Sequence, residues 1–334
     1  MLLTIDQIRE VTTGVEEILQ TENGYDFIRF TSAEASTTDN INLHHPAGVQ
    51  MEFVTDAKSI YIQVETTKLN DTRSYFSFDI FENGKCIGNI CNFEQSHCLG
   101  NYAEQKYPLG VYEKRFDLSD GEKKVKIVFP FSVKAFVKKI ELTDASKIIP
   151  CKRSKRLVAY GDSITQGYDA LHPSDTYIYK FCESLNMELV SKALGGAIFD
   201  CNIINACENP VADLLVVAFG TNDWSGYTFD KIITNVKAFF EAVSKKYSNV
   251  PVIVITPIWR KDCSAPVNGV VFEEVEKLIK NTCIQYENMN VISGISLVEH
   301  NEEFFGDLRL HPNASGFEQY THNLLAHYNA LADA

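Results

Sequence analysis

The sequence has no long hydrophobic run and comparatively little positive charge. None of its 334 residues belongs to an unbroken apolar stretch of the roughly 18 residues that a membrane-spanning helix needs. Lys and Arg number 31 against 44 Asp and Glu, which gives a net charge of −13. Nucleic acids and anionic membranes are bound by clustered cations, and the one basic cluster, KRSKR at 152–156, is interpreted as a solvated linker. We therefore expect neither a nucleic-acid nor a membrane partner.

Paired cysteine motifs are also missing. The nine cysteines are odd in number and scattered, without any C-x-x-C pair. Cys91, His97 and Cys98 come nearest to a metal motif, but their spacing favours free thiols, so no metal is predicted. Reduced thiols favour a cytoplasmic location. The first 20 residues lack the basic leader and apolar block of a signal peptide, and their apolar spacing from Ile5 to Leu19 predicts a helix.

Residues 25–145 have the pattern of an all-β domain. Apolar and polar residues alternate in SIYIQVET at 59–66 and in YFSFDIFE at 75–82, which is typical of half-buried antiparallel strands. Asn83-Gly84 is a hairpin turn signal. Several short strands of this kind predict a β-sandwich or jelly roll. Together with the N-terminal helix they define an expected first domain of residues 1–150.

Residues 151–334 follow a different pattern, in which apolar runs alternate with amphipathic helical segments. The five runs are 156–160, 188–194, 213–220, 251–257 and 289–293. Near-continuous apolar runs are typical of parallel strands that are covered on both faces. The second domain is therefore predicted to be α/β, a doubly wound, flavodoxin-like three-layer fold around a five-stranded parallel sheet, whose ligands bind beyond the carboxyl ends of the strands.

Small and polar residues follow three of these runs. Ser163 follows the first run, Gly195-Gly196 the second and Asn222 the third. Because the carboxyl ends of parallel strands meet at one edge of the sheet, we expect these residues to lie close together. His311 precedes the last predicted helix on a loop that can reach the same edge. A hydroxyl, a histidine, a close-approach glycine and an amide donor are the parts of an acyl-transfer site.

These four segments resemble the conserved blocks of the SGNH (GDSL) hydrolase superfamily. GDSIT matches the first block with Ser163 as nucleophile, LGGA matches the oxyanion glycine at Gly196, GTND matches the asparagine block at Asn222, and HPN matches the histidine at His311. A β-sandwich ahead of such a domain is similar to the layout of carbohydrate esterase family 2. The resemblance implies that His311 is the general base, that Ser163, Gly196 and Asn222 form the oxyanion hole, and that no cofactor is needed.

One position departs from the family pattern. The family usually places an acid three residues before the histidine, but Leu308 stands there and Asp307 stands four residues before His311. Two alternatives remain open. Either the loop carries one extra residue and Asp307 still reaches the imidazole, or a backbone carbonyl orients His311, as in dyads known among the sugar-esterase relatives.

Both tryptophans of the chain fall at the expected active edge. Trp224 follows the asparagine block, and Trp259-Arg260 follow the fourth run. Sugar faces stack well on indole rings. Trp224, Trp259 and Arg260 are therefore candidate substrate-binding residues, with core packing of the two rings as the alternative.

The leading functional hypothesis is a serine esterase that removes a small acyl group, above all acetyl, from a carbohydrate or a similar polar alcohol through an acyl-Ser163 intermediate. The alternatives are a lipase or thioesterase for longer acyl chains, and a carbohydrate-binding protein whose hydrolase domain is inert. The expected partner is a small-molecule or glycan ester. The sequence leaves open the oligomeric state, and whether the sandwich binds sugar or only caps the active edge.

Overall fold

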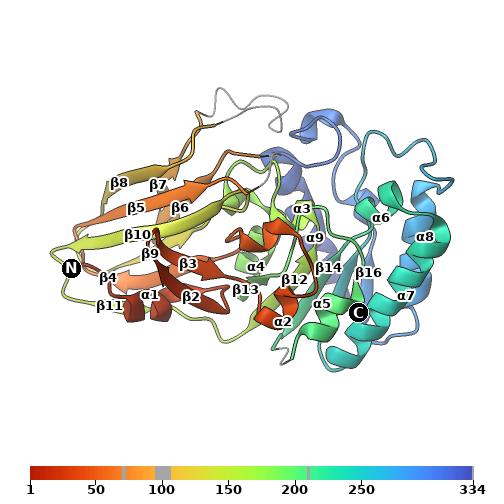
Figure 1. Ribbon diagram of the computed structural model, residues 1–334, viewed down its shortest axis with the longest axis horizontal. Helices are drawn as coiled ribbons and strands as arrows, with labels where there is room; N and C mark the ends of the chain where they lie inside the picture. The colour runs from red at the N-terminus through yellow and green to blue at the C-terminus, as the bar shows by residue number, and fades with distance from the viewer. Residues whose placement is uncertain (70–72, 95–106, 209–210, 333–334) are drawn as a thin grey trace.

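Residues 1–150 form two antiparallel β-sheets in the computed structural model, which describes residues 1–69, 73–94, 107–208 and 211–332 (Figure 1). The first sheet has the order β2-β3-β10-β5-β8, and the second has the order β1-β4-β9-β6-β7, with β11 paired to β4. The first sheet consists of β2 (Glu17–Thr21), β3 (Gly24–Ile28), β10 (Lys134–Thr143), β5 (Ser59–Thr67) and β8 (Val111–Asp117). The second consists of β1 (Thr12–Thr13), β4 (Gln50–Thr55), β9 (Lys123–Val128), β6 (Ser77–Glu82), β7 (Lys85–Cys91) and β11 (Ile148–Pro150). The prediction of a β-sandwich is confirmed.

The predicted N-terminal helix is correct only in its first part. Helix α1 spans Ile5–Val11 and begins with a capping box at Thr4. Residues 15–19, which were expected to continue it, belong instead to the approach to β2 and to β2 itself. Strand β2 pairs with β3 across the turn at Glu22-Asn23. Over so few residues, the spacing of apolar side chains fits both the period of a helix and the period of a strand. The hairpin pairing with β3 decides in favour of a strand.

Strand β6 is buried on both faces, which corrects the expectation of a half-buried strand. Phe78 and Ile80 pack in the sandwich core, as predicted, but Ser77 and Asp79 on the other face are also buried. Asp79 accepts hydrogen bonds from the backbone N–H and the hydroxyl of Ser174, at 3.1 and 2.7 Å. The outer face of β6 is therefore covered by the C-terminal part of the chain.

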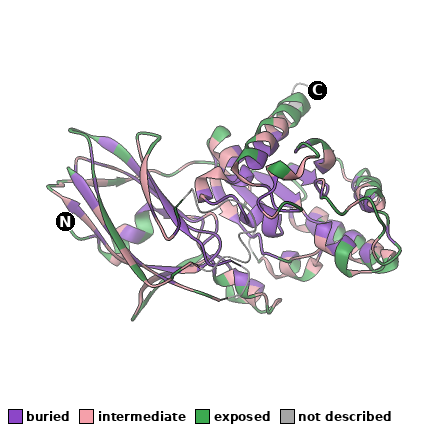
Figure 2. Cartoon of the chain, turned by 90° about the horizontal axis from the view of Figure 1, so that it is seen from above, coloured by how far each residue is buried: buried purple, intermediate pink, exposed green. Residues whose placement is uncertain are grey.

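The C-terminal part contains a five-stranded parallel sheet of order β13-β12-β14-β15-β16. Its strands are β12 (Arg156–Gly161), β13 (Glu188–Ser191), β14 (Leu214–Ala218), β15 (Val252–Ile255) and β16 (Met289–Ile292). Four of them lie within one of the predicted apolar runs, and β12 extends its run, 156–160, by one residue to Gly161. The predicted α/β fold is confirmed, and Figure 2 shows buried residues concentrated in the central strands and exposed residues on the outer sides of the helices.

Helices cover both faces of this sheet. Helices α4 (Tyr177–Ser184) and α9 (Ala314–Ala332) share one core with Leu157 and Ala159 of β12. Helices α5 (Cys201–Ala206), α7 (Phe229–Lys246) and α8 (Phe272–Cys283) share the other core with Val158 and Tyr160. Two short helices begin where strands end, α3 (Ser163–Gln166) after β12 and α6 (Thr221–Gly226) after β14. The remaining short helices are α2 (Ser32–Ala35) and the 3-10 turns Ile41–His44, Pro173–Asp175, Gly294–Ser296 and Glu302–Phe304.

A buried ionic cluster ties the two parts of the chain together. The Lys192 ammonium, which follows β13, lies 2.7 Å from the Glu34 carboxylate and 2.8 Å from that of Glu16. Arg29 is equally buried and donates to the backbone carbonyls of Ser191 and Asn42 at 2.7 and 3.0 Å. Burial lowers the pKa of Arg29 to about 9, and Glu34 opposes this fall. Residues 29–42 therefore leave the sandwich and lie against the parallel sheet, where α2 is beside α5 (Figure 1).

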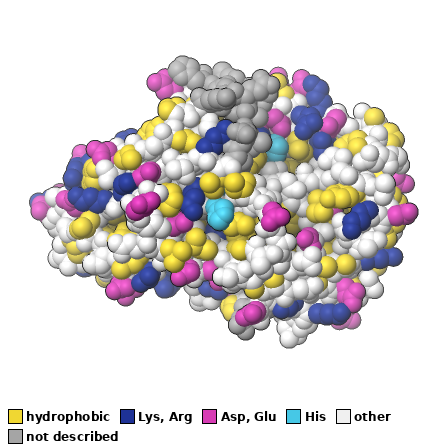
Figure 3. Space-filling model, viewed as in Figure 1, with side chains coloured by type: hydrophobic (Ala, Val, Ile, Leu, Met, Phe, Trp, Pro, Cys, Tyr) yellow, Lys and Arg dark blue, Asp and Glu magenta, His cyan; other side chains and the backbone are white. Residues whose placement is uncertain are grey.

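The visible surface carries charges of both signs. Acidic and basic side chains are interspersed over the face shown in Figure 3. Among the residues that the structure describes, none of the helices combines the length and the hydropathy that crossing a lipid bilayer requires. Eight of the nine cysteines lie in the described segments and all eight are unpaired, whereas His97 and Cys98 of the metal motif considered above fall outside those segments.

Replacing Lys192 by Met should destabilise the fold by about 3–5 kcal/mol, because the buried Glu34 carboxylate loses its partner. Urea unfolding measures the loss. Lys245→Met is the matched control, since it breaks an exposed pair with Glu241 and should change the free energy of unfolding by about 0.5 kcal/mol or less. Equal effects of the two substitutions would contradict a structural role for the buried cluster.

Candidate active site

A tight turn from β12 into α3 presents Ser163. Strand β12 ends at Gly161, where an added Cβ would lie only 2.2 Å from the Thr165 hydroxyl oxygen. Asp162 is the N-cap of α3, and its carboxylate accepts the backbone N–H of Ile164 at 2.9 Å. Ser163 is therefore the first residue of the helix, and it is only 5% exposed. The local sequence dictates this turn, because only glycine leaves room for the side chains of the first helical turn.

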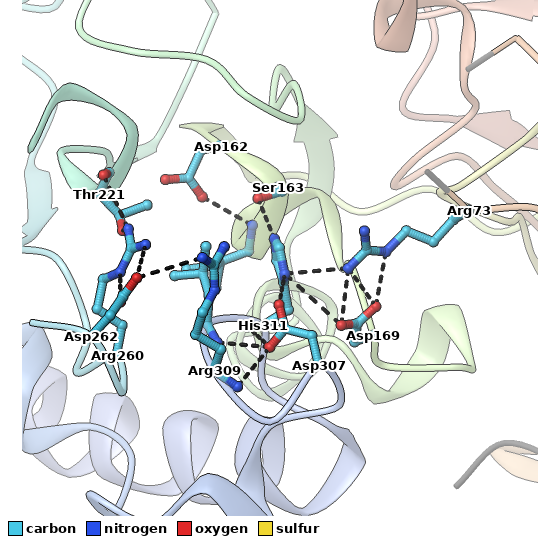
Figure 4. Close-up of polar contacts among 12 residues, drawn as sticks. Arg73, Asp162, Ser163, Asp169, Thr221, Arg260, Asp262, Asp307, Arg309 and His311 are labelled. Carbon is cyan, nitrogen blue, oxygen red and sulfur yellow. Dashed lines mark hydrogen bonds and ion pairs between the residues drawn. The ribbon is translucent and has the colours of Figure 1, made fainter. Parts of the chain in front are cut away.

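The Ser163 hydroxyl contacts the imidazole of His311, as the sequence predicted (Figure 4). Ser163 Oγ lies 2.8 Å from His311 Nε2, and His311 Nδ1 lies 2.7 Å from Asp307 Oδ2. A carboxylate can only accept, so Nδ1 carries the proton and Nε2 is free to accept the serine proton. This hydrogen-bonded chain has the arrangement that activates a serine nucleophile.

The loop before His311 accommodates the extra residue found in the sequence. Leu308 adopts a positive φ of 55°, a backbone conformation that residues other than glycine seldom adopt. The second oxygen of Asp307 accepts the backbone N–H groups of Arg309, Leu310 and His311 at 3.0, 2.7 and 3.0 Å. Of the two alternatives for orienting the imidazole, the geometry favours the carboxylate of Asp307 over a backbone carbonyl.

The local environment shifts the pKa values of Asp307 and Asp162 in opposite directions. Burial alone would raise the pKa of Asp307, but the hydrogen bond and charge of His311 and the backbone donors hold that pKa well below its usual range. Burial raises the pKa of Asp162 to about 6, despite its bond to Ile164. Asp307 is therefore the carboxylate that stays ionised beside the imidazole, and Asp162 serves as a helix cap.

Gly196 and Asn222, the two predicted oxyanion residues, lie on neighbouring segments. Gly196 has a φ of +79°, and the space in front of it is open, with nothing within 4 Å of an added Cβ. The Asn222 side chain, at the start of α6, donates to the carbonyl of Ala197 at 2.9 Å. The structure thus brings the glycine loop and the asparagine block together, as expected from their places at one sheet edge.

Residues from the first part of the chain hold the glycine loop in place. The carbonyl of Gly195 accepts the side-chain amides of Asn40 and Asn42 at 2.8 and 3.2 Å. The N–H of Gly195 donates to the side-chain carbonyl of Gln166 at 2.6 Å. Both backbone polar groups of Gly195 are therefore engaged. Because the Gly195 carbonyl and the Gly196 N–H lie in one peptide plane, the bonds to this carbonyl fix the direction of the Gly196 N–H. Sequence reasoning missed these residues, because polar side chains in loops carry no signal of such a contact.

A further pair beside His311 was also missed. Asp169 is fully buried, and Arg73 of the sandwich forms a two-pronged ion pair with it. Asp169 lies only six residues after Ser163 in the same GDSITQGYD stretch, so its proximity to the site could have been inferred from sequence. Arg73 lies before β6, and no sequence pattern points to it.

Two of the three candidate substrate-binding residues are wrong. Trp224 has no exposed surface, and its indole N–H donates to the carbonyl of Val270 at 2.9 Å. Arg260 is 3% exposed and lies over the Trp224 ring at 4.8 Å, with its head group paired to Asp262. A sugar therefore cannot stack on Trp224, and both residues belong to the core. Trp259 is half-buried and stacks on His300 with ring centroids 5.5 Å apart, so its assignment stays a prediction.

A cavity of about 180 Å³ opens beside Gly196. Its lining combines apolar groups from the strand ends, such as Leu194, Ala197 and Phe219, with Thr37 and Asn40 from the first part of the chain. An apolar cavity of roughly 150 Å³ can hold a benzene ring. This cavity therefore has room for a group larger than acetyl next to Gly196.

The acids around the imidazole do not form a convincing metal site. Ligand-type atoms of Asp169, Asp307 and His311 lie within 4.8 Å of one another. The guanidinium of Arg73, however, occupies both oxygens of Asp169 and would repel a cation. We assign no metal to these residues.

Comparisons with solved structures identify several similar folds. The salicylyl-acyltransferase SsfX3 from a tetracycline biosynthetic pathway is 17% identical, with a TM-score of 0.80 over 96% of this chain and 94% of that chain. A family two carbohydrate esterase from Clostridium thermocellum, in complex with cellohexaose, is 12% identical, with a TM-score of 0.66 over 96% and 99%. The acetyl xylan esterase Est2A from the rumen bacterium Butyrivibrio proteoclasticus is 16% identical, with a TM-score of 0.63 over 99% of both chains. At these identities the likeness shows a shared fold.

The sequence itself matches one family model. No curated protein sequence is significantly similar to the chain. Residues 159–319 match the model of the GDSL-like Lipase/Acylhydrolase family, and this segment contains Ser163, Gly196, Asn222, Asp307 and His311. The resemblance inferred from the four blocks is confirmed. The C-terminal part of this chain therefore contains a GDSL-like lipase/acylhydrolase domain.

Proposed function

We propose that this protein is a serine esterase that cleaves small acyl esters of carbohydrates or similar polar alcohols through an acyl-Ser163 intermediate. The observation that carries the proposal is the hydrogen-bonded chain from Ser163 through His311 to Asp307, with bond lengths of 2.8 and 2.7 Å. The complete arrangement also speaks against the alternative of a binding protein with an inert hydrolase domain.

In the first half of the reaction, the Ser163 oxygen attacks the ester carbonyl while His311 Nε2 accepts its proton. The resulting oxyanion is met by the backbone N–H groups of Ser163 and Gly196 and by the Asn222 amide. Loss of one such donor typically costs about 3–4 kcal/mol of transition-state stabilisation. The imidazolium then returns its proton to the departing alcohol, and the acyl group remains on Ser163.

In the second half, a water molecule attacks the acyl-serine while His311 takes up one of its protons. Collapse of the second tetrahedral intermediate releases the carboxylic acid, and the proton returns to the serine oxygen. Asp307 stays ionised throughout and stabilises the imidazolium in both halves, because its low pKa keeps it an acceptor.

The choice of substrate rests on the shared fold and the layout of the site. An acetyl xylan esterase and a cellohexaose-bound carbohydrate esterase have the same fold over nearly the whole chain. Acidic and basic side chains are interspersed over the face shown in Figure 3, which suits a polar alcohol better than a lipid. Acetylated saccharides are therefore the first substrates to test.

Acyl transfer to an alcohol is a second candidate, and two observations favour it. The structural neighbour with a TM-score of 0.80 is a salicylyl-acyltransferase. In addition, the cavity beside Gly196 exceeds what an acetyl group needs, so it has room for a larger acyl group. Product analysis with an added alcohol acceptor distinguishes the two reactions, since hydrolysis yields free acid and transfer yields a new ester.

Ser163→Ala should lower kcat on p-nitrophenyl acetate by at least about 10⁴-fold, because the nucleophile is lost. Ser184→Ala, which removes an exposed hydroxyl on α4, should leave the rate unchanged. Released acetate from a panel of acetylated mono- and oligosaccharides then identifies the substrate class. A wild type that is inactive on every ester, or one that prefers decanoate to acetate esters, would refute the proposed specificity.

Asp307→Asn should lower kcat by roughly 10⁴-fold with little change in KM, since an amide at this position no longer holds the imidazole in the required tautomer. Steady-state kinetics on the best substrate measure the effect. Glu302→Gln, on the preceding turn, pairs with Lys261 at the surface and is the control. Full activity of Asp307→Asn would instead favour a dyad oriented by a backbone carbonyl.

A further inference from the structure

Arg73 and Asp169 form a buried ion pair that joins the sandwich to the segment that follows α3. Arg73 Nε lies 2.9 Å from Asp169 Oδ1, and Nη2 lies 3.0 Å from Oδ2. The side chains are 6% and 0% exposed. The Tyr75 hydroxyl, two residues along from Arg73, accepts the backbone N–H of Asp169 at 2.8 Å. Two segments 96 residues apart are therefore locked together by both side-chain and backbone contacts.

This ion pair faces the proton-bearing side of the imidazole. Arg73 Nη2 lies 3.3 Å from His311 Nδ1, and Asp169 Oδ2 lies 3.9 Å from the same nitrogen. Because Nδ1 already donates its proton to Asp307, its approach to the guanidinium is a contact between two donors. The interaction is therefore electrostatic, and it acts directly on the charge that the imidazole acquires during catalysis.

We propose that Arg73 is a positioning residue through which the sandwich domain tunes the general base, by neutralising Asp169 so that the charge of Asp307 faces His311 Nδ1 uncompensated. Among the described residues, three ionised groups lie close to Nδ1, namely Asp307, Asp169 and Arg73, with a net charge of −1. The proposal rests on the proposed function for its kinetic consequence. The effect of Arg73 on the charge of the imidazole does not depend on that function.

The other groups around His311 do not replace Arg73. The ring of Tyr168 lies 5.7 Å from the imidazole and also lies against Arg73, at 4.7 Å. Asp162 interacts with the imidazole only through charge, and Arg260 partly offsets it. Arg309, on the histidine loop, pairs with Asp262 at 3.5 Å. Among the described residues, Arg73 is the cation that contacts the imidazole.

Counting these charges predicts that substitutions of Arg73 and of Asp169 have opposite effects on the stability of the imidazolium. Arg73→Met leaves two carboxylates beside Nδ1, which favours the imidazolium, so a higher pH is needed to free the base. Asp169→Asn leaves Arg73 to cancel Asp307, which disfavours the imidazolium. The double variant restores the net charge of −1, and so does Arg73→Lys. Charges at about 4–6 Å shift a titration by about one pH unit or more.

The test is the acidic limb of the pH profile of kcat/KM. We expect it to move up by about one pH unit in Arg73→Met, to move down in Asp169→Asn, and to return close to its wild-type position in the double variant and in Arg73→Lys. If Arg73→Met does not fold, Asp169→Asn and Arg73→Lys carry the test. An acidic limb that stays in place in the single variants, or a double variant that is not restored, would overturn the proposal.

A control separates this role from simple attachment of the sandwich. Lys126→Met breaks the 2.6 Å ion pair between β9 and Glu183 of α4, which also joins the two parts of the chain, and it should leave the acidic limb unchanged. A shift in this variant as large as that of Arg73→Met would also overturn the proposal.

The pH titration of the His311 ring, followed by NMR in the Ser163→Ala background, measures the same shifts without any substrate. Absent esterase activity would therefore refute the proposed function while leaving the role of Arg73 open to this measurement. If the imidazole titrates identically in Ser163→Ala and in the double variant Ser163→Ala/Arg73→Met, the role of Arg73 itself is refuted.

Discussion

The contact between the Ser163 hydroxyl and the His311 imidazole is the interaction on which the rest of this structure depends. It joins residues 148 positions apart, one on the turn after β12 and the other on the loop before α9. An imidazole is set to accept the serine proton at one nitrogen when its other nitrogen donates to a fixed acceptor. Asp307 is that acceptor, and the ion pair of Arg73 and Asp169 lies beside the same nitrogen.

The sandwich reaches the site from two sides. Arg73 approaches the base, while Asn40 and Asn42 hold the peptide unit that precedes the oxyanion glycine. The cost of burying these groups is offset by ion pairs and hydrogen bonds, as it is for Lys192 between Glu16 and Glu34. The shared hydrophobic core, which includes Tyr75 and Phe131 beside Tyr177 of α4, extends the same connection. The first part of the chain thus supplies structural groups of the site, beyond any role as a cap.

Sequence reasoning succeeded where the local pattern and the final environment agree. The five parallel strands were recognisable because strands covered on both faces read as apolar runs. It failed where a distant segment changed the environment. Ser77 and Asp79 alternate with apolar residues as if they faced solvent, yet Ser174 and its neighbours cover them. Trp224 stands at the correct sheet edge, but its ring turns into the core against Phe272.

The sequence by itself determined the two kinds of sheet and the chemical groups at the strand ends, including Ser163, Gly196, Asn222 and His311, because strand period and turn chemistry are local properties. Only the tertiary structure decided that Asp307 reaches the imidazole despite the extra loop residue, and that Arg73 and Asp169 face the same nitrogen. Such contacts depend on how segments far apart in the chain pack against one another, and a one-dimensional pattern records that a residue is polar without recording which partner it meets.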